Sequence, residues 1–453
     1  MWTFEEAEAY LNHTAPPGKS EYGLERIDSL LDLLDHPESS FPCVTIVGTN
    51  GKGSVTAFLD SLLRAHGIRT ACHIKPHLES VTERIRLHGI DSTPEEFASA
   101  LSTVKQAVDR GWTRKDRPTY FELVFAAFLD AARRAGVDVA LLEAGLGGRL
   151  DAVNSVDSLL VILTSVSYDH TELLGDTLDS IAREKLAVVR PGSTLVCGDN
   201  PKEVMDVVKA VSDDVGFRAV GPGTCPELES RSDSQWQVAL NSVGHLENLT
   251  LGLDGVFQPG NASLALQSLE VMATDVMSEL FHHGLNSDAI RKGLAEARLP
   301  GRWERFDLAD GTRWILDGAH NPSALERILG RFAAETSRQG TIIFGMKKTK
   351  DFHCIADAIV RCANAVVLVE LPCGESHHPD DMARVLRHGL DNTHGFSQIQ
   401  IGKADSMLEA VETAASLTPA DGTILVTGSL YLVGAVGTIL KERALIPSGK
   451  QVV

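Results

Sequence analysis

The sequence predicts an α/β fold made of two domains, each built on a mainly parallel sheet. Short apolar runs such as CVTIVG (43–48) alternate with segments of helical spacing such as SVTAFLDSLLRAHG (54–67). This alternation is typical of parallel strands that are joined by helices. The length of 453 residues suits two or three domains of roughly 100–200 residues each. The alternation is interrupted once and then restarts, which predicts where the domain boundary lies.

The composition excludes several classes of protein. Lys and Arg number 42 against 61 Asp and Glu, and the net charge of −19 argues against nucleic acid or an anionic membrane as the main partner. No apolar run reaches the roughly 18–20 residues of a membrane span, and MWTFEEAEAY lacks the basic and apolar regions of a signal peptide. Seven cysteines without a CxxC pair indicate reduced thiols. We therefore expect a cytoplasmic protein.

The first predicted domain covers residues 1–297. Apolar spacing predicts further elements after the first strand and helix, namely helices at 120–136 and 178–192 and strands at 137–145, 158–166 and 193–198. From about 215 to 255, turn residues replace helix formers, and we expect a small β-rich insert there. A helix resumes at 260–273.

The second predicted domain covers residues 298–453. The short charged segment ARLPGRWERF (297–306) suggests a hinge, and the alternation restarts after it. The expected strands are WILD, TIIFG, AVVLVEL, SQIQIG and GTILVTG, with a helix between each pair. This strand count suits an open doubly wound sheet, and we expect a cleft between the two domains.

The strongest motif is a glycine-rich loop between the first strand and the first helix. It consists of Gly48, Thr49, Asn50, Gly51, Lys52, Gly53 and Ser54. Glycines let backbone N–H groups turn toward phosphate oxygens, the helix N-terminus adds partial positive charge, and Lys52 adds a full charge. Ser54 stands where such loops bind Mg²⁺. The alternative is a glycine-rich turn with a surface lysine. The spacing differs from the common G-x-x-x-x-G-K-[ST] because Gly53 separates the lysine from the serine.

Ionisable residues follow two buried strands of the first domain. Glu143 ends the strand at 137–145, and Asp169-His170 follows the strand at 158–166. Ligands of open α/β sheets bind at such strand ends, so a metal site is one interpretation. The alternatives are a solvent-facing Glu143 and a histidine that only hydrogen-bonds to the protein. Lys185, in AREKLAVV, would by itself be an ordinary lysine on a helix surface.

A similar group ends the first strand of the second domain. Asp317 and His320 lie in DGAHNP, where they could face the cleft. An Asx-turn with Asn321 as the helix N-cap explains the same residues, and both interpretations can hold together.

The chain resembles the folylpolyglutamate synthase/dihydrofolate synthase branch of the Mur ligase family over nearly its whole length. The resemblance rests on GLERIDSLLDLLDHPE (23–38), GTNGKGSV, PHLESVTERIRLHG, TYFELVFAAFLDAA, LLEAGLGGRLDAVN, TSVSYDHTELLGDTLDSIAREK, FQPGNASLAL, PGRWERF, ILDGAHNPSAL and VTGSLYLVG (426–434). It implies a Mur-ligase-like P-loop ATPase domain with a mainly parallel sheet and a smaller Rossmann-like C-terminal domain. It also favours a monomer.

The resemblance implies an ATP-dependent amide ligase of one-carbon metabolism. ATP phosphorylates a substrate carboxylate to an acyl phosphate, an amino acid amine attacks it, and the amide, ADP and phosphate are the products. The protein's part is charge neutralisation and positioning. The expected substrates are a folate-like acid and a glutamate-like amino acid.

The resemblance also implies roles for residues of the first domain. Lys52 and the loop amides would bind the ATP phosphates, with Ser54 and Glu143 on the first Mg²⁺ and His170 on a second. Lys185 matches a lysine that the family carbamylates.

Further roles fall near and beyond the hinge. Asn261 and Arg302 match nucleotide contacts, while Asp317 and His320 match residues that complete the ATP site when the domains close. Closure would exclude water from the acyl phosphate.

The sequence departs from the family pattern at three places. Lys75 stands where the family usually has a serine beside the first Mg²⁺, Thr349 stands where it often has Asp, and ESHHPDD (375–381) lacks a common Arg-Ala pair. Lys75 either supplies charge to the metal, phosphate or substrate, or turns away and leaves the position to water. The other two departures lie in the domain that receives the amino acid.

Three functions remain open at this stage. The first is an ATP-dependent ligase that joins glutamate to folate or dihydropteroate. The second is a paralogue with the same chemistry and a different acid and amine, as in specialised metabolism. The third is a nucleotide-binding protein without catalysis, which Lys75 motivates.

Overall fold

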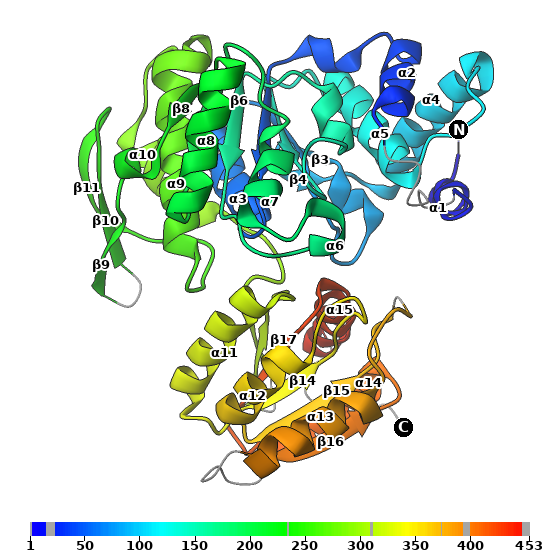
Figure 1. Cartoon of the computed structure of the whole chain (residues 1–453), viewed down its shortest axis with the longest axis vertical. Coiled ribbons are helices and arrows are strands. Elements are labelled where there is room, and N and C mark those ends of the chain that lie inside the picture. Colours follow the sequence, from blue (N-terminus) through cyan, green and yellow to red (C-terminus); the bar gives the residue numbers. More distant parts are fainter. Residues whose placement is uncertain are drawn as a thin grey trace. The chain divides into compact units, whose positions relative to one another are not determined.

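A computed structural model describes residues 2–14, 23–232, 235–308, 311–372, 374–392 and 399–445. The chain divides into two compact units, one formed by Met1–Gly252 and Phe257–Arg298 and the other by Leu253–Val256 and Leu299–Val453. Both units are α/β, so the predicted fold class is confirmed (Figure 1).

The first unit is built on an eight-stranded sheet of order β4-β3-β2-β5-β1-β6-β7-β8. The strands are β1 Cys43–Val47, β2 Thr70–His73, β3 Arg86–Leu87, β4 Ile90–Asp91, β5 Val139–Glu143, β6 Leu160–Leu163, β7 Thr194–Cys197 and β8 Arg218–Val220. Strands β2, β5, β1, β6, β7 and β8 run parallel, and β3 and β4 add an antiparallel edge.

Ten helices belong to the described part of this unit. They are α1 Phe4–Asn12, α2 Glu25–Leu33, α3 Lys52–Ala65, α4 Pro94–Gly111, α5 Tyr120–Ala135, α6 Thr171–Leu174, α7 Leu178–Leu186, α8 Lys202–Val215, α9 Gln258–Val271 and α10 Ser287–Glu296. Two of them show how local sequence sets their ends. Thr93 and Thr119 each form a capping box with the Glu three residues later, and Gly136 ends α5 in the left-handed region.

Helices cover both faces of the large sheet. On one face, alternate strand residues such as Cys43 and Val47 join a buried cluster with α2, α4, α5, α7 and α8. Val44 and Ile46, which alternate with them, are also buried but belong to the opposite face. Helix α3 packs against α9 and α10 and against β1, β2 and β5. Both faces of these strands are therefore buried, which explains why their sequences are continuous apolar runs.

Between β8 and α9 the chain forms a separate antiparallel sheet. It contains β9 Glu229–Ser232, β10 Gln235–Leu240 and β11 Gly244–Leu249 in the order β11-β10-β9. Figure 1 shows this small sheet beside α10.

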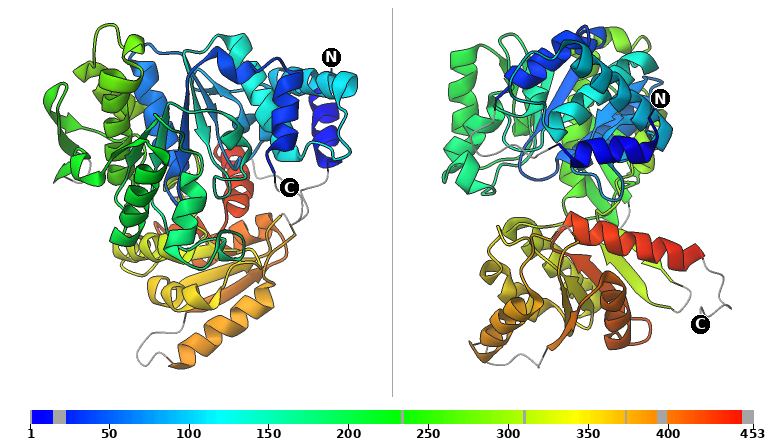
Figure 2. Two further views of the ribbon diagram at one scale, coloured as in Figure 1. Left: turned by 45° about the horizontal axis from the view of Figure 1, so that its top comes forward. Right: turned by 90° about the vertical axis from the view of Figure 1, so that its right-hand side faces the viewer.

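The second unit is built on a six-stranded sheet of order β12-β13-β17-β14-β15-β16. Its elements are β12 Glu304–Asp307, β13 Arg313–Leu316, α11 Pro322–Thr336, β14 Thr341–Phe344, α12 His353–Cys362, β15 Ala365–Val369, α13 Pro379–Asn392, β16 Gln400–Ala404, α14 Met407–Leu417, β17 Thr423–Thr427 and α15 Leu430–Leu445. Helix α12 packs against α11 and α13, whereas α14 packs against α15. The two groups lie on opposite faces of the sheet (Figure 2).

Two sequence predictions were wrong in their bounds. Helix α7 ends at Leu186, not at residue 192, because Val188 and Val189 are β-branched, buried and already in the turn toward β7. The predicted hinge 297–306 contains the start of β12, the antiparallel edge strand, whose charged sequence ERFD hides its strand character.

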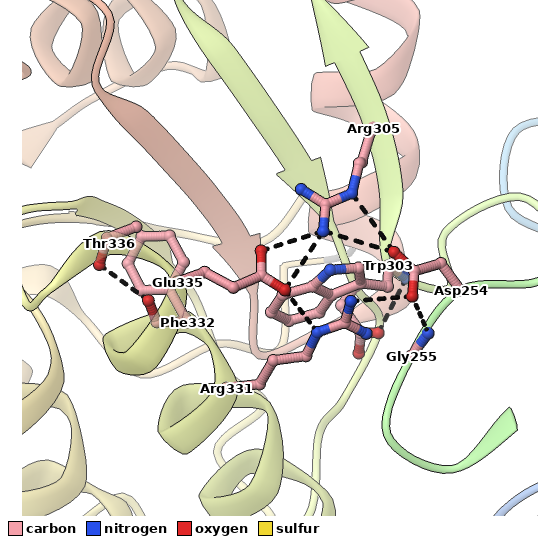
Figure 3. Close-up of polar contacts among 9 residues, drawn as sticks. Asp254, Gly255, Trp303, Arg305, Arg331, Phe332, Glu335 and Thr336 are labelled. Atoms are coloured by element: carbon pink, nitrogen blue, oxygen red, sulfur yellow. Dashed lines mark hydrogen bonds and ion pairs between the residues drawn. The ribbon is translucent and has the colours of Figure 1, made fainter. Parts of the chain in front are cut away.

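The loop 253–256 is tied to the second unit by a charged cluster. Asp254 pairs with Arg305 of β12 and with Arg331 of α11, and both arginines also pair with Glu335 (Figure 3). The Arg331 guanidinium lies 4.3 Å from the centre of the buried Trp303 ring. These contacts explain why a loop that lies far from β12 in the sequence belongs to the same unit.

None of the helices in the described ranges has the length and apolar character that a membrane span needs. The described cysteines are all unpaired, as predicted for reduced thiols. Cys373 lies outside the described residues.

Candidate active site

The glycine-rich loop connects the buried strand β1 to the N-terminus of α3. Gly48 and Gly51 have φ values of +149° and +89°, in the region that favours glycine. A Cβ atom on Gly48 would overlap the Thr164 hydroxyl, and one on Gly51 would lie 2.6 Å from Asn261 Oδ1. Glycine is therefore needed at both positions, for conformation and for space.

The loop is anchored to the end of β6 and the segment after it. Thr49 N donates to Ser165 O over 2.6 Å, and Thr164 Oγ1 donates to Asn50 O over 2.7 Å. Thr49 Oγ1 also donates to Ser167 O over 3.1 Å. These contacts fix the backbone of the loop before any phosphate binds.

Lys52 and Ser54 open helix α3. Lys52 Nζ donates to Gly48 O and Thr49 O, at 3.0 and 3.1 Å. Ser54 is buried in the first turn. A helix N-terminus with a lysine folded over the loop is a ready-made site for phosphate groups.

Lys185 is a buried residue of α7, so its description as a helix-surface lysine was wrong. Its Nζ donates to Gly48 O over 2.9 Å, across 137 positions of sequence. Burial, together with the charge of Lys52, lowers the pKa of Lys185 to about 7. A large fraction of this amine is therefore neutral near physiological pH.

Glu143 is buried at the carboxyl end of β5. In the parallel pairing of β1 with β5 it stands opposite Ile46, two residues before Gly48, so it lies beside the start of the loop. Its Oε2 accepts a hydrogen bond from the backbone N–H of Lys75 at 3.2 Å. A solvent-facing Glu143, the alternative weighed from the sequence, is excluded.

His170 lies after β6, next to the short helix α6. It has a positive φ of +49°, and its side chain is 42% exposed. Its Nε2 lies 3.9 Å from Asp169 Oδ1, and its Nδ1 lies 3.9 Å from Glu172 Oε1. The imidazole of His170 is therefore partly exposed and lies between two carboxylates.

The donor set suits Mg²⁺ carried by a nucleotide. Over the described residues, no three His, Cys, Asp or Glu side chains converge to hold a metal ion alone. Ser54 and Glu143 offer only a hydroxyl and a carboxylate, and Mg²⁺ prefers oxygen ligands and usually keeps several waters and phosphate oxygens. The residues therefore fit a metal that binds with ATP, and they do not fit a structural metal cage.

Asn261 of α9 reaches the same loop. Its Nδ2 donates to Gln258 Oε1 over 3.1 Å, which leaves Oδ1 directed at Gly51. Five predicted residues therefore gather around one loop in the first unit, namely Lys52, Ser54, Glu143, Lys185 and Asn261.

The second unit gathers the other predicted residues. The buried Asp317 carboxylate accepts hydrogen bonds from Ala319 N and Trp303 N, at 2.9 and 3.0 Å. Burial raises the pKa of Asp317, and the charge of Arg302 opposes this shift. His320 Nδ1 lies 2.9 Å from Gly318 O.

Both interpretations of the DGAHNP segment can hold. Asn321 caps α11, because its Oδ1 accepts from Ala324 N at 3.0 Å. A Cβ on Gly318 would lie 2.7 Å from Arg302 Nη1, so the hinge arginine lies against the same turn as Asp317 and His320.

Sequence reasoning missed two residues of the first unit. Thr164 fixes the loop backbone, and the buried Asp151 pairs with Lys75 at 3.0 Å. Asp151 belongs to the motif LLEAGLGGRLDAVN, so only its role was missed. Thr164 likewise opens the motif TSVSYDHTELLGDTLDSIAREK, so its role, too, was missed and not its position.

A family model described as "Mur ligase, glutamate ligase domain" matches residues 301–430. The dihydrofolate synthase/folylpolyglutamate synthase of Escherichia coli is 32% identical over 426 residues, which cover 93% of this chain and 92% of that protein. A probable bifunctional folylpolyglutamate synthase/dihydropteroate synthase of Haloferax volcanii is 29% identical over 94% of this chain, which spans only 49% of that protein.

Solved structures agree over the whole length. Folylpolyglutamate synthase of Mycobacterium tuberculosis, complexed with ADP and AMPPCP, has a TM-score of 0.83 at 27% identity and 99% coverage of both chains. A bifunctional folylpolyglutamate synthase/dihydrofolate synthase with Mn, AMPPNP and L-glutamate bound has a TM-score of 0.79 at 27% identity, covering 97% of this chain and 98% of that one.

Proposed function

The chain belongs to the folylpolyglutamate synthase/dihydrofolate synthase branch of the Mur ligase family, and from that premise we propose that it is an ATP-dependent ligase joining glutamate to a folate or to dihydropteroate. The observation that carries the proposal is the loop 48–54 with Lys52, Lys185 and Glu143 against it. This arrangement offers cations and backbone N–H groups to a triphosphate beside a buried carboxylate.

The reaction proceeds in two displacements. An oxygen of the substrate carboxylate attacks the γ-phosphorus of ATP, the bond to the β,γ-bridging oxygen breaks, and ADP leaves. The amine nitrogen of the amino acid then attacks the acyl carbon, phosphate leaves, and the nitrogen loses a proton. The first step builds the leaving group that a carboxylate lacks.

The residues of the first unit neutralise and orient the phosphates. Lys52 and the backbone N–H groups at the start of α3 bind the β- and γ-phosphate oxygens, where negative charge shifts during transfer. Mg²⁺, when bound, supplies further charge neutralisation, with Ser54 and Glu143 to hold it and His170 for a second ion. Asn261 positions the nucleotide from α9.

Lys185 carries a carbamate in the active enzyme. Its buried amine has a pKa of about 7, so the neutral nitrogen attacks CO₂, an N–C bond forms and one proton is released. The product is an anionic, carboxylate-like group beside Lys52. With ¹³CO₂ supplied, ¹³C NMR of the native enzyme is expected to show one carbamate signal, which Lys185→Met removes. A spectrum without this signal in active enzyme contradicts the modification.

Arg302, Asp317 and His320 of the second unit lie around the turn after β13, and we propose that this group acts on phosphate during transfer. We expect His320→Ala to lower kcat with a smaller change in the KM for ATP, because a residue that acts mainly on the transition state contributes little to ground-state binding. A change confined to KM would place His320 outside the chemistry.

A second candidate keeps this chemistry and changes the amine or the acid. The two departures of the second unit lie together, since His377 N donates to Met346 O at 3.0 Å and Lys348 N donates to Glu375 O at 3.0 Å. One altered surface therefore joins the segments 345–351 and 375–381, in the domain expected to receive the amino acid.

One assay separates the two candidates. Phosphate release is measured with Mg²⁺-ATP and a matrix of acids and amines, and product masses are read in parallel. We expect release only when dihydropteroate or tetrahydrofolate is combined with glutamate, and a product heavier by one glutamyl unit. Turnover with another pair, and none with folates, would favour the second candidate. Lys52→Ala is the control that abolishes nucleotide-dependent release.

A further inference from the structure

Lys75 follows β2 and makes contacts with two carboxylates. Its backbone N–H donates to Glu143 Oε2 at 3.2 Å, and its ammonium lies 3.0 Å from Asp151 Oδ1. The parallel pairing of β2 with β5 sets His73 opposite Leu142, so the chain just after each strand lies side by side. Lys75 therefore stands between the carboxylate predicted to bind Mg²⁺ and a second one that no role explains.

The Lys75–Asp151 pair is buried. The side chains are only 8% and 9% exposed, and the ammonium also lies 5.9 Å from the Phe125 ring centre. Burial by itself would raise the pKa of Asp151, but the charge of Lys75 and hydrogen bonds from Val153 and Gly145 lower it. Asp151 is therefore ionised, and its charge is balanced by Lys75.

Asp151 closes the loop that follows β5. Its Oδ2 accepts from Gly145 N at 2.8 Å and from Leu146 N at 3.2 Å, and its Oδ1 accepts from Val153 N at 3.1 Å. The carboxylate thus holds both ends of the segment 145–151, which begins two residues after Glu143.

The same loop packs against the helix of Lys185. A Cβ on Gly148 would lie 2.7 Å from Glu184 O and 2.8 Å from Lys185 O, and Arg149 N donates to Glu184 O at 3.0 Å. A continuous series of contacts therefore links Lys75 to Asp151, Asp151 to the loop 145–151, and this loop to the backbone of Lys185.

A buried ion pair is costly, because two charges leave water, and an apolar pair of similar volume is often at least as stable. Stability alone does not account for the position of this pair. Its position at the carboxyl ends of β2 and β5, against Glu143, points to a role at the ligand-binding edge of the sheet.

We propose that Lys75 is a positioning residue whose ammonium balances Asp151, so that Glu143 is the one carboxylate of the two that receives a divalent cation. The ammonium neutralises Asp151, as a metal ion would neutralise a carboxylate that had no cationic partner. It also holds the loop 145–151 between Glu143 and Lys185.

Charge predicts opposite effects for the two partners. Lys75→Met leaves the Asp151 carboxylate without its ammonium, so Mn²⁺ binds more tightly to the protein complexed with AMPPNP, by about fivefold or more for charges a few ångströms apart. Asp151→Asn leaves the Lys75 ammonium without its carboxylate, on the residue whose backbone N–H contacts Glu143, and weakens Mn²⁺ binding by a similar factor. A purely structural role would weaken binding in both variants.

The experiment combines Mn²⁺ titration by electron paramagnetic resonance with thermal unfolding of the full chain. Each single variant is expected to lower Tm, and the charge-balanced double variant Lys75→Met/Asp151→Asn is expected to recover part of the loss and to return Mn²⁺ affinity toward the parent. Should Lys75→Met fail to fold, Asp151→Asn, the double variant and Lys75→Arg still provide the comparison. Lys209→Met, which breaks the exposed pair with Asp213 on α8, is the matched control and should change neither quantity.

Shifts of Mn²⁺ affinity in the same direction in both single variants, unchanged Mn²⁺ affinity, or additive Tm losses in the double variant would overturn the proposal. Only the identity of the metal-dependent reaction rests on the proposed ligase function. Because Mn²⁺ binding and Tm need no turnover, a protein inactive with every acid and amine pair would refute the ligase function and leave this inference standing.

Discussion

At the residue scale, burial decides which predicted side chains can act. Lys185 had no signal of burial in its own helix, and the structure places its amine 2.9 Å from Gly48 O, at the centre of the candidate site. Thr164 and Asp151 are also buried or partly buried residues that contact distant segments. Thr164 bonds to the loop residue Asn50, and Asp151 pairs with Lys75. Spacing along the chain cannot reveal such contacts, because they depend on packing between strands.

The lowered pKa of Lys185 predicts how its contribution to stability changes with pH. Between its folded pKa of about 7 and its unfolded value near 10.4, the unfolded state binds the extra proton. The free energy of unfolding therefore rises with pH in this window. Lys185→Met removes the titration, so any stability advantage of this variant at pH 7 should shrink as pH rises toward 10.

Urea unfolding of both proteins in CO₂-free buffer at several pH values measures this difference. CO₂ must be excluded because a carbamate would replace the titrating amine. A stability difference between parent and variant that stays constant from pH 7 to 10 would show that the pKa of Lys185 is not lowered.

At the element scale, strand ends and helix starts were predictable because they carry strong local patterns. The β1–loop–α3 unit and the DGAHNP turn are where the sequence predicted them, and Asn321 caps α11 as expected. Strand β12 was missed because ERFD has the composition of a surface segment, and only its pairing with β13 makes it a strand.

A substitution of Gly51 tests whether the glycine-rich loop needs its conformation and close packing to bind nucleotide. Gly51→Ala strains a φ of +89° and also places a Cβ 2.6 Å from Asn261 Oδ1, so we expect nucleotide affinity to fall about tenfold or more. Gly67→Ala is the matched control: it strains a φ of +81° after α3 but meets no atom within 4 Å. It should lower stability by about 1–2 kcal/mol and leave ADP binding unchanged. Equal losses of ADP affinity, measured by calorimetry, would refute the role of close packing.

Substitutions in the charged cluster of Figure 3 test which contacts bind the loop 253–256 to the second unit. Arg331 lies 4.3 Å from the Trp303 ring centre and is 18% exposed, whereas Arg305 shares its partners but lies 6.0 Å from the ring and is 46% exposed. Arg331→Met should therefore destabilise the protein by about 1–2 kcal/mol, and Arg305→Met by less than about 1 kcal/mol. Denaturant unfolding gives both values, and a larger loss for Arg305→Met would contradict this ranking.

At the scale of the whole molecule, the sequence was sufficient for the fold class and for the family. Motifs spread from residue 23 to residue 434 carry the resemblance, and the relatives match over more than nine-tenths of the chain. The fold does not by itself identify the substrates, and for this reason the proposal of a second candidate rests on the paired segments 345–351 and 375–381.

The central claim is that ATP activates a substrate carboxylate by phosphorylating it. The most direct test supplies dihydropteroate or tetrahydrofolate with ¹⁸O in the reacting carboxylate, together with ATP and glutamate, and analyses the released phosphate by mass spectrometry. An acyl phosphate intermediate predicts one ¹⁸O atom in each phosphate, because the attacking carboxylate oxygen leaves with phosphorus. Phosphate free of ¹⁸O during product formation would contradict the mechanism.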